Sequence, residues 1–161
     1  MAFWSTNNSE PLRKFRFIVT FGEELWYAKS VSKPSFDVST SEYQLVNHKI
    51  KYPGVVTWND IDIVIVDTKE KKKGLAYYKD IVANGYNFSG DANDGIKKQL
   101  SQWFASKDVL ITQLGSDGKK VEEWKLINPF VKSIKFGDLD YSSDDLVEIT
   151  ITVTYDSAVL S

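Results

Sequence analysis

The chain has 161 residues, of which 42% are hydrophobic and 14% aromatic, with a net charge of −2 and no cysteine. This length is typical of one domain with a real hydrophobic core. The charge excludes a molecule that is basic over its whole surface, and the lack of cysteine excludes disulfides and thiolate metal sites. We recognise no secretory signal and no apolar run near the roughly 20 residues that span a bilayer. We therefore expect a soluble protein made in the cytosol, with a single domain over residues 1–161.

The N-terminal quarter predicts an arm, a hairpin and a loop. Residues 1–11 are polar and predict an arm. Lys14–Phe21 alternates in hydrophobicity, Gly22 opens a turn, and Leu25–Val31 predicts a returning strand. Ser32–Glu42 contains a proline and five serine or threonine residues, and it predicts an extended loop. A patternless segment of this length inside a compact domain is typical of an interaction segment.

Two long strands are predicted next, Tyr43–Lys51 and Val55–Asp67, joined at Tyr52-Pro53-Gly54. Pro-Gly is a turn signal. In the second strand, Ile61, Ile63 and Ile65 share one face. Both strands exceed the usual five or six residues, which favours a ribbon that extends into a sheet shared with other subunits.

The rest of the chain predicts a helix and further strands. Asp67–Asn84 predicts the helix, with Leu75, Tyr78, Ile81 and Val82 near one face. A hairpin around Gly115 and a strand over Phe130–Phe136 follow. The count is about eight strands and one clear helix. The predicted fold is therefore mainly β, an antiparallel sandwich or barrel with one flanking α-helix.

The most informative segment is the last strand, which alternates over nine residues. This period of two indicates one buried face and one polar face. The polar face carries hydroxyl groups where Lys and Glu would be usual, which favours a wet cavity or another subunit over ordinary solvent. The apolar face is formed by Val147, Ile149, Ile151, Val153 and Tyr155. The polar face is formed by Glu148, Thr150, Thr152 and Thr154.

Little in the sequence points to catalysis. His48 is the only histidine, so a Ser-His-Asp triad or a two-histidine metal site has no material. Paired acids alone do not make glycosidase chemistry, which needs two carboxylates across a cleft. A calcium loop over residues 138–145 is an alternative to a charged turn, but its spacing is not that of the helical calcium-binding loop. We predict no catalytic residue, no metal and no cofactor. The acidic pairs are Asp60 with Asp62, Glu122 with Glu123, Asp138 with Asp140, and Asp144 with Asp145.

Two further classes of function stay open at this point. Five tryptophans could form a carbohydrate-binding platform on a β-sandwich, although core or interface positions suit their apolar surroundings better. A hydrolase that works through the acids of residues 138–145 is the other. Glycan binding by a stable monomer would support the first of these two.

Six short motifs run in order along nearly the whole chain, and the last is the most specific. They are Leu12–Phe17 (LRKFRF), Lys29–Phe36 (KSVSKPSF), Asn47–Lys49 (NHK), Tyr52–Gly54 (YPG), Trp58–Ile61 (WNDI) and Phe136–Ile149 (FGDLDYSSDDLVEI). In these motifs the sequence resembles the tail tube proteins of contractile-tailed, T4-like phages.

The resemblance implies a structural subunit of a tail tube. Six copies would form a ring whose strands make one continuous inner β-barrel, and rings would stack into a hollow tube inside the contractile sheath. Its partners would be other copies of itself, the sheath protein, a baseplate or tube initiator, and tape measure protein and DNA in the lumen, with transient contact to the host envelope. It would be assembled in the host cytoplasm and reside in the virion. The inner tube or tube initiator of another contractile injection system is the alternative.

With this resemblance, three sets of residues are expected to serve assembly. The extended loop Ser32–Glu42 and the arm are expected to contact the next ring, the loop through Ser35, Phe36, Asp37, Val38 and Ser39. The lumen or intersubunit face is expected on Glu148, Thr150, Thr152 and Thr154, or alternatively on Asp60 and Asp62. An acidic interface loop is expected at Asp138, Asp140, Asp144 and Asp145.

Overall fold

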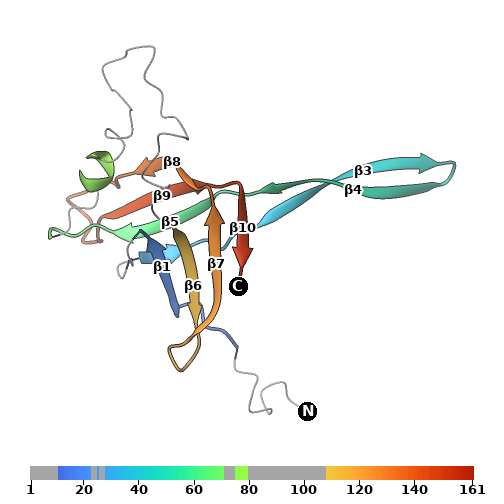
Figure 1. The fold of residues 1–161 in the computed structure, drawn as a ribbon. Coiled ribbons are helices and arrows are strands. Elements are labelled where there is room, and N and C mark those ends of the chain that lie inside the picture. Colours follow the sequence, from blue (N-terminus) through green and yellow to red (C-terminus); the bar gives the residue numbers. More distant parts are fainter. Residues whose placement is uncertain (1–10, 23–24, 26–27, 71–74, 80–107) are drawn as a thin grey trace.

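The fold is a β-sandwich from which a long hairpin extends (Figure 1). It was analysed in a computed structural model that describes residues 11–22, 25, 28–70, 75–79 and 108–161. Two four-stranded antiparallel sheets face each other across a common core, and a two-stranded sheet forms the hairpin. The predicted mainly β fold is confirmed, and it takes the sandwich form.

The first sheet has the strand order β1-β6-β7-β10. The predicted hairpin around Gly115 is confirmed as β6 and β7. The last strand, β10, was not predicted, because four residues are too few to display an alternating pattern. The bounds are β1 (Phe17–Phe21), β6 (Val109–Leu114), β7 (Lys120–Ile127) and β10 (Ser157–Leu160).

The second sheet has the strand order β2-β5-β9-β8. The predicted hairpin between Lys14–Phe21 and Leu25–Val31 is wrong, because β1 pairs with β6 and β2 pairs with β5. The chain instead crosses between the sheets after Gly22, whose φ of 73° suits glycine. Alternation shows that both strands face a core, but it does not show that they pair. The bounds are β2 (Ala28–Val31), β5 (Ile61–Val66), β8 (Phe130–Lys135) and β9 (Glu148–Thr154).

The core lies between the two sheets and is built from β-branched residues. The alternation predicted for residues 147–155 is confirmed in β9, since Ile149, Ile151 and Val153 are fully buried. The isoleucines of β5 share that core, because Ile61 lies opposite Val153 and Ile63 opposite Ile151. The first sheet contributes Val19, Phe21, Val109, Ile111 and Leu126.

The hairpin consists of β3 (Phe36–Leu45) and β4 (His48–Trp58). It overturns two predictions, because the proposed loop Ser32–Glu42 is largely strand, and Tyr52-Pro53-Gly54 lies inside β4. The chain reverses at Val46–Asn47 instead. A register shift between Val38 and Thr40 accommodates Pro-Gly within the ladder. Gly54 leaves room for Ser39 there, because a Cβ atom would lie 2.4 Å from the Ser39 hydroxyl oxygen, which would have to move.

The predicted helix Asp67–Asn84 is seen only over residues 75–79, because residues 67–70 are not helical and the remainder of the range lies outside the described residues. Tyr77 is the buried residue of this turn and packs edge-on against Phe21 at 6.1 Å between ring centroids. Leu75 and Tyr78 of the predicted apolar face are exposed, and the other two residues of that face, Ile81 and Val82, lie outside the described residues. Most of the predicted arm also lies outside the described residues. None of the helical segments described is long and apolar enough to cross a membrane.

Candidate assembly surfaces

The outer, polar face of the sheet β2-β5-β9-β8 combines both sets of residues that were predicted as alternative lumen faces. Asp62 lies opposite Thr152 in the β5–β9 register. The Thr152 hydroxyl donates a hydrogen bond to Asp62 Oδ1 at 2.7 Å, and the Thr154 hydroxyl donates one to Asp60 Oδ1 at 2.8 Å. The two alternatives are therefore one surface. We call it the polar face.

The polar face also contains lysines, and carboxylates hold two of them. Lys132 Nζ lies 2.7 Å from Asp60 Oδ2, and Lys29 forms an ion pair with Glu148. The hydrogen bonds from Lys132 and then Thr154 lower the pKa of Asp60. The Glu148 carboxylate raises the pKa of Lys29. Sequence reasoning missed both lysines, because a cross-strand partner is visible only when the strand order is known.

The predicted inter-ring residues Ser35–Ser39 lie at the base of the hairpin, where they attach it to the sandwich. Asn59 Nδ2 donates to Ser35 Oγ at 3.1 Å and to Asp37 Oδ2 at 2.9 Å. The Phe36 ring packs on Trp58 at 5.1 Å, and Trp58 packs on the ring of Tyr155. Burial raises the pKa of Tyr155. These residues therefore fix the direction in which the hairpin leaves the sandwich.

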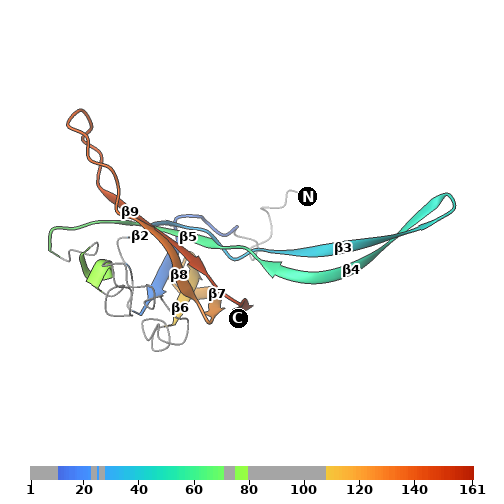
Figure 2. The same ribbon diagram turned by 90° about the horizontal axis from the view of Figure 1, so that it is seen from above.

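Residues 136–147 connect β8 to β9, and we call them the acidic loop. Figure 2 shows that this loop projects away from both sheets. Asp140 Oδ1 accepts hydrogen bonds from the backbone N–H and hydroxyl of Ser142 at 2.9 and 2.8 Å, which lower the pKa of Asp140. Asp145 Oδ2 accepts one from the Ser143 hydroxyl at 3.1 Å. Asp140 and Asp145 thus shape turns, and no group of acids or histidines suited to a metal ion occurs in the described part of the chain.

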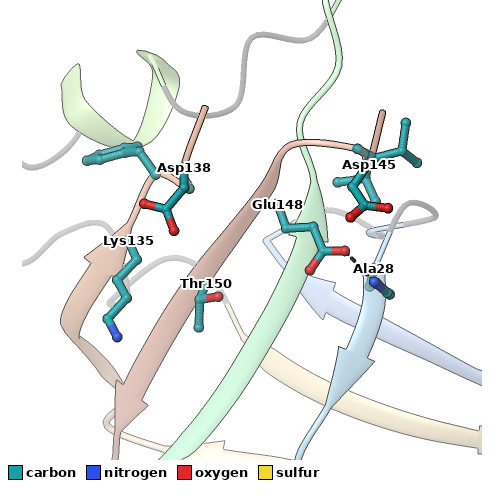
Figure 3. Close-up of a pocket in the computed structure, with 11 residues that line it drawn as sticks. Ala28, Lys135, Asp138, Asp145, Glu148 and Thr150 are labelled. Atoms are coloured by element: carbon teal, nitrogen blue, oxygen red, sulfur yellow. Dashed lines mark hydrogen bonds and ion pairs between the residues drawn. The ribbon is translucent and has the colours of Figure 1, made fainter. Parts of the chain in front are cut away.

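A cleft of about 1030 Å³ lies between the acidic loop and the polar face (Figure 3). Asp138, Lys135 and Thr150 lie on one side of the cleft, and Glu148 and Asp145 lie on the other (Figure 3). The cleft therefore joins two of the three predicted sets of assembly residues. Among the described residues, its lining contains no serine, cysteine or histidine.

The tryptophans within the described residues do not form an exposed platform. Trp58 and Trp124 are partly buried and pack against the core. The other three, Trp4, Trp26 and Trp103, lie outside the described residues. His48, the only histidine, lies at the start of β4 near the tip of the hairpin.

Comparison with known proteins relates the chain to tail tubes. The sequence model of the T4-like virus tail tube protein gp19 matches residues 13–158. No curated protein matches the sequence. A chain from the extended sheath–tube complex of PVC, an extracellular contractile injection system, is 24% identical with a TM-score of 0.71, and the match covers 98% of this chain and 99% of that one. A chain from the tube-terminating cap of the anti-feeding prophage is 23% identical with a TM-score of 0.72, covering 100% and 99%.

The PVC sheath and tube terminator in its extended state is similar to the same degree, with 22% identity, a TM-score of 0.71, and coverage of 94% of this chain and 97% of that one. At these identities the structural likeness shows the fold. The family match spans nearly the whole chain, so this protein belongs to the T4-like tail tube family. It is a structural subunit of a tail tube, and the predicted resemblance is confirmed.

Proposed function

We propose that six copies of this chain form a ring, and that rings stack into the tail tube. The observation that carries the proposal is that β2 and β8 are the edge strands of the sheet β2-β5-β9-β8, with no further neighbour among the strands that the structure describes. An edge strand has unpaired backbone groups, which a ring of copies satisfies when β8 of one copy pairs with β2 of the next. Such an interface is heterologous and closes when the rotation per copy divides a full turn. The number six comes from the family resemblance.

The polar face is proposed to line the lumen of the tube. On this face the side chains of Lys29 and Lys132 are engaged by carboxylates, and threonine hydroxyls fill the centre. Free lysines would hold DNA phosphates through counterion release. Because Lys29 and Lys132 are neutralised locally, their part of the wall would let DNA slide without binding it.

The tube is proposed to lie inside a contractile sheath and to start from a baseplate or initiator, with tape measure protein and then DNA in its lumen. Solved relatives of this fold come from a sheath–tube complex, a baseplate and a tube cap. The site of action would be the virion tail, after assembly in the host cytoplasm, with transient contact to the host envelope. The protein would have no catalytic role. The hairpin base and the N-terminal arm are proposed to contact the next ring.

A second candidate is the inner tube or initiator of a contractile injection system. The similarity in fold to PVC and anti-feeding prophage subunits favours it. Genes next to this one would separate the two candidates, since capsid genes accompany a phage tail.

Electron microscopy of the purified protein tests the ring directly. We expect six-fold ring averages and stacked tubes in negative stain. Lys119→Glu, in the turn between β6 and β7, is a matched control that should assemble as the unchanged protein does. A monomer at every protein concentration, with or without a sheath or baseplate partner, would contradict the proposal.

Chemical labelling tests which face lines the lumen, because the chain has no cysteine of its own. In assembled tubes, Thr152→Cys is expected to react with a small maleimide but not with one carrying a 5-kDa polymer, a size chosen to be about that of a small protein domain. Lys119→Cys should react with both reagents. Equal reaction of Thr152→Cys with both reagents in tubes would place the polar face on the outside.

A further inference from the structure

The distal half of the hairpin is an amphipathic ribbon that has no partner among the described residues of its own chain outside the hairpin itself. Every residue of β3 is exposed. In the β3–β4 register, Tyr43 lies opposite Ile50, and Ser41 lies opposite Tyr52. Cross-strand partners share a face, so tyrosine and isoleucine side chains gather on one side, together with Leu45. A two-stranded hairpin is marginally stable alone in water, so this apolar side requires a cover.

The other side of the distal half is charged. Glu42 lies opposite Lys51, and Gln44 lies opposite Lys49. Lys49 Nζ and Lys51 Nζ lie 3.4 and 3.8 Å from Glu42 carboxylate oxygens. Two lysines against one glutamate leave this half with a net charge of +1 between residues 42 and 51.

The acidic loop has the complementary character. Residues 136–147 contain four aspartates and no lysine or arginine. Large apolar side chains lie among these acids in the open, since Leu139 is 88% exposed, and Tyr141 and Leu146 are also exposed. Exposed apolar side chains of this size, clustered in one loop and interleaved with charge, are typical of a contact surface.

The hairpin and the acidic loop leave the sandwich at opposite ends of the same sheet. β5 begins at Ile61, just after the hairpin, and ends at Val66, which lies opposite Glu148 at the start of β9. Glu148 directly follows the acidic loop. Figure 1 shows the hairpin extending far from the end of the sheet at which β5 begins. The two segments therefore cannot meet within one copy.

We infer that the distal half of the hairpin, residues 41–52, docks on the acidic loop of a second copy in the adjacent ring. This inference rests on the proposed stacking of rings. The apolar side would cover Leu139 and Leu146, and Lys49 and Lys51 would lie close to the aspartates. Because donor and acceptor lie at opposite ends of each copy, the contact is heterologous and does not close, so it propagates along the tube. One end of the tube would expose hairpins and the other would expose acidic loops.

Thiol cross-linking tests the contact. Val46, 92% exposed at the tip of the hairpin, and Leu139 are replaced by cysteine in a chain that has none. In assembled tubes, a short bismaleimide should link the Val46→Cys/Leu139→Cys variant into a ladder that continues past six copies. Each single variant should stay monomeric in the denaturing gel. Tubes of the double variant without a ladder, or a ladder that stops at six, would overturn the inference.

Charge exchange supplies a second measurement. Lys49→Glu/Lys51→Glu and Asp144→Lys/Asp145→Lys should each abolish tubes while leaving the circular dichroism spectrum unchanged. Combining all four changes in one chain should restore tubes. If both double variants form tubes at the yield of the unchanged protein, the hairpin does not use these charges and the inference is wrong. If the unchanged protein itself forms neither rings nor tubes, the proposed function fails first.

Discussion

The sandwich and the distal half of the hairpin carry the same sequence pattern with opposite outcomes. In β5 and β9 the alternate residues Ile63 and Ile151 are fully buried within the chain. In the hairpin the alternate residues Tyr43 and Tyr52 are exposed. The difference is the opposing sheet, which covers the sandwich strands and does not reach the hairpin. Alternation thus predicts that a face will be covered, but it does not say by which molecule.

The largest effect is expected from a charge in the sandwich. Ile151→Asp places a carboxylate at a position with 0% exposure in a central strand. Burial of an unpaired charge costs several kcal/mol, which is a large part of the roughly 5–15 kcal/mol that stabilise a domain. We expect insoluble protein, measured as the soluble fraction after expression.

The neighbouring residue Thr150 provides the control for this substitution. Thr150 is on the polar face and lies opposite Lys135 in the β8–β9 register. Thr150→Asp should therefore stay soluble and folded. Soluble, folded Ile151→Asp protein would contradict the assignment of the two faces of β9.

Removal of the distal hairpin should abolish assembly without unfolding the sandwich. Thr40 and Pro53 lie opposite each other, so residues 41–52 can be replaced by an Asn-Gly turn. The lost segment contributes nothing to the core, and we expect the free energy of unfolding to change by less than about 1 kcal/mol. Urea denaturation and negative-stain microscopy measure the two properties.

A matched insertion separates the hairpin from a general effect of altered turns. Two residues, Gly-Ser, inserted after Ser116 in the β6–β7 turn should leave both unfolding and tubes unchanged. If the truncated protein still forms long tubes, the distal hairpin is not a docking element. If it unfolds, the comparison between sandwich and hairpin is wrong.

Much of the sandwich was predictable, because its strands alternate and its core is self-contained. Strand β9, the β6–β7 hairpin and the isoleucine face of β5 follow from local pattern. Strand partners did not follow, since the crossing after Gly22 depends on which sheet each strand joins. The hairpin was misread because Tyr52-Pro53-Gly54 carries a strong turn signal, while the actual turn at Val46–Asn47 carries a weaker one.

The surface sites were only partly predictable for a related reason. The sequence shows that their residues are polar or acidic. Which of these side chains form hydrogen bonds and ion pairs with one another depends on the pairing of the strands. Asp60 and Thr154 are 94 positions apart and share a hydrogen bond. No local pattern contains this contact, so the sequence left two alternatives for a single face.

Gly137 tests whether the acidic loop is firmly attached to the sandwich at its base. Its φ is +91°, and a Cβ atom would lie 2.6 Å from the Glu148 carbonyl oxygen. Gly137→Ala should cost about 2 kcal/mol through backbone strain and this clash, which lowers the Tm by about 4–8 °C. Gly118→Ala is the comparison, because Gly118 also has a positive φ but an added Cβ meets nothing within 4 Å. The Tm of the Gly118→Ala variant should fall less. An equal fall in the Tm of both variants would show that the base of the acidic loop accommodates a Cβ atom with little loss of stability.

The smallest effect should come from the polar face, whose contacts stabilise charges that water also solvates. The pKa of Asp60 lies below its ordinary value of 3.8, because Lys132 and Thr154 donate to the ionised form. A lowered folded-state pKa contributes stability above the ordinary pKa, and that contribution is lost as the pH falls through the folded value. Exposed ion pairs contribute about 0–1 kcal/mol.

Asp60→Asn should therefore lower the free energy of unfolding by that amount at pH 7. Between pH 7 and pH 3, the free energy of unfolding should fall less in this variant than in the unchanged protein. Urea midpoints at the two pH values measure this, with Asp138→Asn in the acidic loop as the control. An unchanged pH dependence in Asp60→Asn would mean that the pair with Lys132 contributes nothing, and that the polar face is held in place by the buried side of its strands alone.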